Sequence, residues 1–177
     1  MRKGIYNQKG FTIPEILVAM TILSALVAVS VTSIDSSKLG ADNISSSLMS
    51  AFSDITLSIT NYNDDKNTMP TGLDDPTFVS YYIFPPAAPK GFDTSYGVNG
   101  YNMARQTGQV SPNNGWYVCA RAALSGANDV KWQAIILTAR NLSPERFFYN
   151  TACPSRANMA APGAATTVYV TNWITNE

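Results

Sequence analysis

The chain has 177 residues, 45% of them apolar, a length that suits a single domain with an appendage. Twelve basic and twelve acidic residues give zero formal net charge, which gives no support for bulk nucleic-acid binding because that usually needs a basic excess. Histidine is absent and cysteine occurs twice, which removes the commonest general base and zinc ligand and excludes a four-cysteine metal site.

Motifs that would indicate catalysis are also missing. Neither GxxxxGK[ST] nor GxGxxG occurs in the sequence, so it has no phosphate-binding loop of either kind. The carboxylate pairs Asp64-Asp65 and Asp74-Asp75 lie among Asn, Lys, Thr, Pro and Gly, a setting typical of solvated loop charges. We therefore predict that the protein is not an enzyme and has no catalytic residues, no metal and no cofactor.

The N-terminus joins a short basic segment to a long apolar one. Residues 1–10 carry three basic side chains and end in Gly10. Residues 11–34 contain one charge, Glu15, and as a helix they would extend about 36 Å, enough to cross a hydrocarbon core of roughly 30 Å. The basic residues before this segment predict that the N-terminus is cytoplasmic.

Two ordinary membrane segments are alternatives. A secretory signal peptide would need a small-residue cleavage site, for which Ser24-Ala25 or Ala28-Val29-Ser30 are candidates. An uncleaved single-pass anchor is the other alternative. The position of Glu15 argues against both, because a lone carboxylate near the start of an apolar segment is costly unless something pairs with it.

A cut between Gly10 and Phe11 would supply that partner. The new α-amino group of Phe11 would be a positive charge in an apolar setting, and Glu15 of the same or a neighbouring subunit could neutralise it. A pair between subunits would also fix their axial register, because two buried charges do not separate cheaply. Pro14 fits this cut, since in a helix that begins at Phe11 its missing N–H lies among donors that have no helical partner.

The string KGFTIPE at residues 9–15, followed by ILVAM, resembles the class III leader of type IV prepilins and pseudopilins. The resemblance implies that a prepilin peptidase cuts after Gly10 on the cytoplasmic face and N-methylates Phe11, and that Glu15 is needed for assembly. Pro14 departs from the pattern, because major pilins more often carry an aliphatic residue there. Proline favours a minor pilin or a pseudopilin.

Residues 35–62 predict the amphipathic continuation of the same helix. One apolar stripe recurs every three or four residues, formed by Ile44, Leu48, Phe52, Ile55, Ile59 and Tyr62. Gly40 is a predicted weak point where this helix bends or melts. The turn residues and proline of the segment 61–72 predict where it ends.

Residues 63–114 are rich in proline and glycine and predict an irregular connecting loop. Within it, the run 78–84 is either a strand or a helical turn. In the pilin family this region joins the helix to the sheet. Its aromatic residues are candidates for an adhesive surface, but loop side chains that cover a core are the simpler interpretation.

The last segment, residues 115–177, predicts the sheet. Aromatic and β-branched residues cluster in four runs, namely 115–122, 131–138, 146–149 and 166–171, although 146–149 is also compatible with a helical turn. The predicted fold class is α+β, with one long helix packed on a roughly four-stranded antiparallel sheet. By resemblance this is the type IV pilin fold.

Cys119 and Cys153 are an even pair in a chain that we expect to be exported, which predicts a disulfide bond. The alternative is two reduced cysteines in the core. The pair also resembles the C-terminal disulfide region of many type IV pilins.

The resemblance implies a structural subunit of a type IV pilus-like filament, major or minor. One alternative is a pseudopilin of a type II secretion or DNA-uptake machine, and another is a membrane-anchored periplasmic binding domain that never polymerises. Implied partners are copies of itself and other pilins, the prepilin peptidase, and an inner-membrane assembly platform with an ATPase. The implied location is the bacterial inner membrane before assembly, and afterwards a filament in the periplasm or outside the cell.

Nucleic-acid binding by the C-terminal part would require its basic residues to form a stripe. The candidates are Arg105, Arg121, Lys131, Arg140, Arg146 and Arg156. Their spacing in the sequence does not predict that they gather on one face, so a nucleic-acid partner is not expected.

Overall fold

A computed structural model describes residue 14 and residues 16–22, 36–81 and 87–175. For residues 36 and 37 it describes the backbone alone. The chain divides into two compact units, Met1–Ser36 and Ser37–Glu177. Among the described residues of the first unit, Pro14 and residues 16–22 are helical. The described residues of the second unit contain the sheet and two α-helices.

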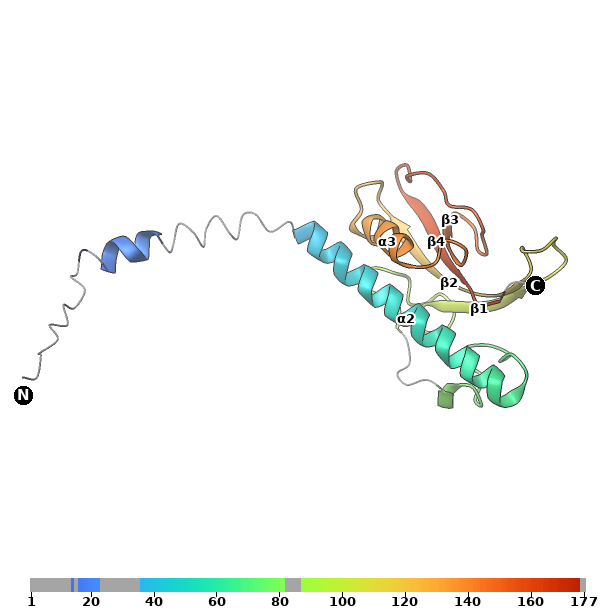
Figure 1. Ribbon diagram of the computed structural model, residues 1–177. Helices are drawn as coiled ribbons and strands as arrows, with labels where there is room; N and C mark the ends of the chain where they lie inside the picture. The colour runs from blue at the N-terminus through green and yellow to red at the C-terminus, as the bar shows by residue number, and fades with distance from the viewer. Residues whose placement is uncertain (1–13, 15, 23–35, 82–86, 176–177) are drawn as a thin grey trace, which may run out of the picture. The chain divides into compact units, whose positions relative to one another are not determined.

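The long helix α2 spans Ser36–Lys66 (Figure 1). The predicted apolar stripe is confirmed, because Leu48, Phe52, Ile55, Ile59 and Tyr62 are buried and Ile44 is partly buried against the core. These residues recur every three or four positions and so lie on one face of the helix. The Phe52 ring meets Tyr101 and Phe147 edge to face, at centroid distances of 5.5 and 5.9 Å, which anchors the helix to both outer strands of the sheet.

Gly40 does not interrupt α2, contrary to the sequence-based prediction. A Cβ atom at this position would lie 3.2 Å from Cγ2 of Val130. The neighbouring Ala41 is buried, and the hydroxyl groups of Ser45 and Thr138 share a buried hydrogen bond of 2.9 Å. Because Gly40 has no side chain, the second helix, which contains Val130 and Thr138, packs close to α2. This packing stabilises α2 at a residue whose own helix propensity is low.

The sheet consists of four antiparallel strands in the order β1-β2-β4-β3. Figure 1 shows that the sheet lies beside α2. The strands are β1 Tyr101–Gln106, β2 Gly115–Leu124, β3 Phe147–Asn150 and β4 Thr166–Trp173. The α+β class and the number of strands agree with the prediction. The core lies between the sheet and the helices, where Val118, Ala120, Val168 and Val170 join the residues of α2.

One predicted strand is a helix. The segment 131–138 lies in α3, Val130–Asn141, and not in the sheet. The Asp129 side chain caps the helix by accepting a 2.9 Å hydrogen bond from the backbone N–H of Lys131. Trp132, Ile135 and Thr138 are buried, and their spacing of three suits one helix face, whereas a strand would bury alternate residues.

The fourth strand comes from the segment predicted to be irregular. Strand β1 lies within residues 63–114, and its buried Tyr101 and Met103 alternate with exposed or half-buried residues. Asn99 and Gly100 both have positive φ, at 54° and 93°, between Val98 and Tyr101, which pair as a bridge. Asn-Gly is the strongest short-range signal for such a turn, and the preceding prolines obscured it. The run 78–84 contributes the 3-10 helix η1, Val79–Tyr81.

Candidate functional site: the N-terminal helix and the disulfide region

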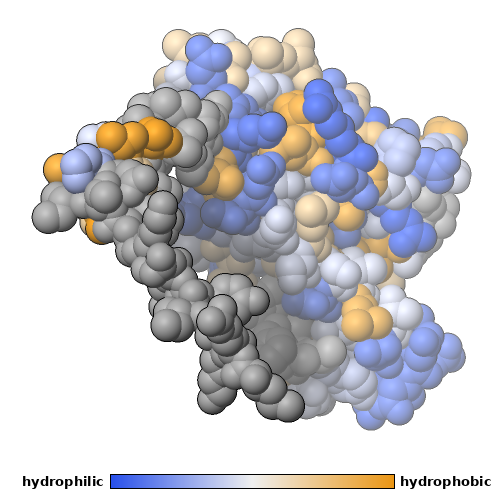
Figure 2. All heavy atoms as spheres, turned by 60° about the vertical axis from the view of Figure 1, so that its left-hand side comes forward, coloured by the Kyte–Doolittle hydropathy of each residue, from blue (hydrophilic) through white to orange (hydrophobic). Residues whose placement is uncertain are grey.

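The described part of the N-terminal helix, residues 16–22, carries apolar side chains at every position except Thr21. The side chains of residues 16–22 are all exposed, including Leu17 at 59% and Met20 at 63%, and in Figure 2 hydrophobic atoms lie on the surface of this described stretch between grey parts of the chain. The Thr21 hydroxyl donates to the Val18 carbonyl at 2.8 Å, so this polar group is satisfied within the helix. Such a surface requires lipid or other helices to cover it.

The residues assigned to cleavage, methylation and assembly, Gly10, Phe11 and Glu15, lie outside the described residues. Pro14 lies in helical conformation beside them. An open apolar depression is lined by Pro14, Val18, Ala19 and Ile22, whose spacing of four, one and three places them on one face of the helix. Within the described part of the chain, no helix combines the length and the apolar character needed to cross a membrane.

The two cysteines form the expected bond. Cys119 and Cys153 are joined as a disulfide across a sequence separation of 34, with their Cα atoms 6.4 Å apart. Cys119 is buried in the middle of β2, whereas Cys153 lies in the loop after β3. The bond therefore ties an irregular loop to an inner strand of the sheet.

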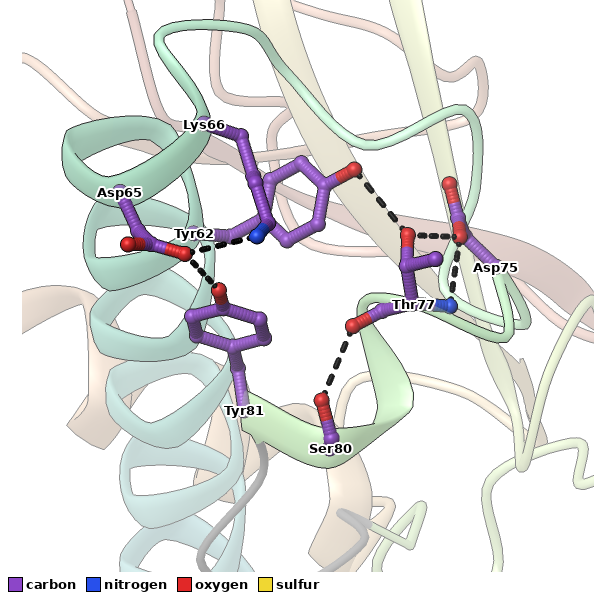
Figure 3. A network of polar contacts seen from close by, with 7 residues as sticks. All are labelled: Tyr62, Asp65, Lys66, Asp75, Thr77, Ser80 and Tyr81. Carbon is purple, nitrogen blue, oxygen red and sulfur yellow. Dashed lines mark hydrogen bonds and ion pairs between the residues drawn. The ribbon is translucent and has the colours of Figure 1, made fainter.

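Two carboxylates organise the contact between the end of α2 and the following segment (Figure 3). Asp65 does so directly, and Asp75 through Thr77, whose hydroxyl lies 3.2 Å from the Tyr62 hydroxyl. Asp65 accepts hydrogen bonds from the Tyr81 hydroxyl and from Lys66, the latter at 3.0 Å. Thr77 donates from its hydroxyl at 2.7 Å and from its backbone N–H at 2.9 Å to Asp75, and these bonds hold the pKa of Asp75 well below its usual range. The hydrogen bonds of Asp65 and Asp75 therefore have a structural role.

Two basic residues of the second unit lie against carboxylates. Arg121 pairs with Asp93, and Lys131 lies 3.4 Å from Asp129. A nucleic-acid surface needs basic groups that can face phosphate, whereas these two side chains face carboxylates.

Asp93 makes the stability of the fold sensitive to acid. Ser95 donates from its hydroxyl at 2.6 Å and from its backbone N–H at 2.9 Å, and Arg121 Nε donates at 2.9 Å. The Ser95 and Arg121 bonds lower the pKa of Asp93 from 3.8 to about 2. A carboxylate whose pKa is lower in the folded state stabilises the fold above its unfolded pKa and loses this effect as the pH falls.

We therefore expect the free energy of unfolding to decline as the pH falls from about 4 to about 2, and Asp93→Asn to flatten this decline. Urea titrations at several pH values would measure it. Asp42→Asn, at an exposed position of α2, is the matched control and should keep the slope of the parent. Equal slopes for parent and Asp93→Asn would contradict the assignment.

The comparison with protein families concerns the N-terminus. Residues 5–31 match the prokaryotic N-terminal methylation motif, which is the class III prepilin leader of the type IV pilin and pseudopilin family. The match includes Gly10, Phe11, Glu15 and the apolar helix 16–22. No curated protein and no solved structure shows significant similarity to the chain.

Proposed function

We propose, from the class III prepilin leader that this chain carries, that it is a structural subunit of a type IV pilus-like filament. In this proposal the helix of residues 11–34 holds the subunit in the inner membrane before assembly, with a cytoplasmic N-terminus, and later packs against copies of itself and other pilins. The unit Ser37–Glu177 remains outside the membrane. The protein has no catalytic role.

The observation that carries the proposal is the exposed surface of residues 16–22 behind the leader, which is apolar apart from Thr21. Lipid and a bundle of like helices are both able to cover such a surface, so one helix can serve first as an anchor and then as a filament core. Because lipid already hides the apolar area, burial in the filament gains little free energy. Assembly therefore needs a platform with an ATPase to extract the subunit.

The fold supports this role. A long amphipathic helix packed on a four-stranded antiparallel sheet is the arrangement expected of the type IV pilin fold, and the disulfide bond ties a C-terminal loop to an inner strand. A covalent tie of this kind suits a subunit that bears tension outside the cell. In this scheme residues 1–10 are removed by the prepilin peptidase.

Mass spectrometry of the protein purified from its native membrane tests the proposal. We expect a chain that begins at N-methylated Phe11. A chain that begins at Met1 would identify an uncleaved anchor, and one that begins after Ser24 or later would identify a signal peptide. The amount in sheared surface fibres then separates a pilus subunit, which is enriched there, from a pseudopilin, which is not.

A further inference from the structure

A polar pocket lies at the end of the sheet where β1 turns into β2 and β4 ends. Its volume is about 240 Å³, and it is lined by Gln106, Gln109, Asn113, Ser155, Arg156 and Trp173, with Pro154 at its side. The register places Gln106 opposite Gly115 and Trp173 opposite Tyr117, so these distant segments meet through strand pairing. All of the lining residues belong to the unit Ser37–Glu177.

The first wall is the loop between β1 and β2. The Gln109 backbone N–H donates to Asn114 Oδ1 at 2.9 Å, and Asn114 Nδ2 donates back to the Gln109 carbonyl at 2.5 Å. The Asn113 backbone N–H donates to the Val110 carbonyl at 2.9 Å. These bonds use backbone groups and Asn114, so the loop is held in shape while the Gln109 and Asn113 side chains face solvent at the pocket.

The second wall is the segment 154–156. The disulfide bond fixes its start, because Cys153 is joined to Cys119. The Trp173 Nε1–H donates to the Ser155 carbonyl at 2.9 Å, and the Ser155 hydroxyl accepts from Asn150 Nδ2 at 3.1 Å. The wall is therefore attached to both inner strands and to β3, which gives the pocket a fixed shape.

Arg156 supplies the charge of the pocket. Its Cζ atom lies 3.8 Å from the centroid of the Trp173 ring, well within the range of a cation–π contact. Burial lowers the pKa of its guanidinium, so the charged form is less well solvated here than in water. Trp173 as a whole residue is 2% exposed, so its ring has no open face on which a neutral ring could stack.

The chemistry of the lining defines the ligand class. One planar cation, whose Nη1 also donates to the Glu145 carbonyl at 3.5 Å, is suited to a carboxylate because a guanidinium carries five N–H donors. Each amide side chain offers a donor and an acceptor, the combination that hydroxyl groups require. None of the described lining residues is acidic, and the volume lies just below the roughly 300–1,000 Å³ of drug-sized sites, which favours a single ring.

We propose that this pocket binds a sugar ring that carries a carboxylate, with Arg156 on the carboxylate and with Gln109 and Asn113 on the hydroxyl groups. Such a site goes beyond the filament role, because it gives the subunit a specific contact with an acidic saccharide. It does not depend on how the N-terminal helix assembles.

The test is a titration of the full processed chain in detergent micelles with methyl glucuronide, followed by calorimetry or by ligand-observed NMR. Methyl glucoside, acetate and inorganic phosphate are titrated in parallel. We expect methyl glucuronide to bind at least about tenfold more tightly than any of the three, a difference of about 1.4 kcal/mol, because it alone combines the carboxylate with the sugar hydroxyl groups. If methyl glucoside binds as tightly as methyl glucuronide, Arg156 does not recognise the carboxylate and the proposal is wrong. If acetate or phosphate binds as tightly, Gln109 and Asn113 do not recognise the sugar hydroxyl groups, and the proposal is equally wrong.

Variants assign the contacts. Arg156→Lys keeps the charge but not the planar fork and should lower the affinity for methyl glucuronide about tenfold. Because this change also touches Trp173, Gln109→Ala and Asn113→Ala on the exposed loop provide a second measure, with about three- to tenfold losses expected. Val110→Ala in the same loop, at a side chain that is 82% exposed, is the matched control. No binding by the parent chain, or parent-like binding by all three pocket variants, would overturn the proposal.

Discussion

Glu15→Ala is expected to abolish filament assembly while cleavage after Gly10 continues. In the proposed scheme, removal of the leader leaves the ammonium group of Phe11 at the start of an apolar segment, where the Glu15 carboxylate would neutralise it. Leaving one member of a buried ion pair alone typically costs about 3–5 kcal/mol, and a filament repeats this cost in every subunit. The result would be processed subunits that remain in the membrane.

Electron microscopy of sheared fibres, together with mass spectrometry of the membrane fraction, measures both parts of this result. Glu145→Ala is the matched control, because it removes one exposed carboxylate from the second unit and should leave fibres unchanged. If Glu15→Ala cells make normal fibres, the ion-pair hypothesis is wrong even though the leader is present.

We expect removal of the disulfide bond to lower the free energy of unfolding by a large amount. Closing a loop across a sequence separation of 34 is expected to stabilise the fold by about 4 kcal/mol through the lost entropy of the unfolded chain. This is a large share of the roughly 5–15 kcal/mol that stabilises an ordinary domain. The double variant Cys119→Ala/Cys153→Ala avoids a free thiol, and we expect its unfolding midpoint to fall accordingly.

Urea unfolding of the parent and the double variant, followed by tryptophan fluorescence, gives the two free energies. A reductant should destabilise the parent and leave the variant unchanged, which controls for the loss of Cys119 packing in the core. A difference below about 1 kcal/mol between parent and variant would show that the bond contributes little to folding.

Patterns within one helix could be predicted from the sequence because their causes are local. The stripe from Leu48 to Tyr62 follows from the helical period, and its burial needs only some apolar partner. The aromatic and β-branched runs that form β2 and β4 were also visible in the sequence. Helix α3 was missed because Trp132, Ile135 and Ile136 favour strands by type, and the cap at Asp129 was the signal that would have corrected the prediction.

The sequence alone determined the N-terminal motif of residues 5–31. The roles that we propose for Gly10, Phe11 and Glu15 rest on residues close together in the chain, so their local order carries the information. Tertiary structure decided which segments complete the sheet, that Gly40 admits a second helix, and that Gln109, Arg156 and Trp173 line one pocket. Strand pairing and side-chain packing join residues far apart in the chain, and no local pattern records which distant partner each will meet.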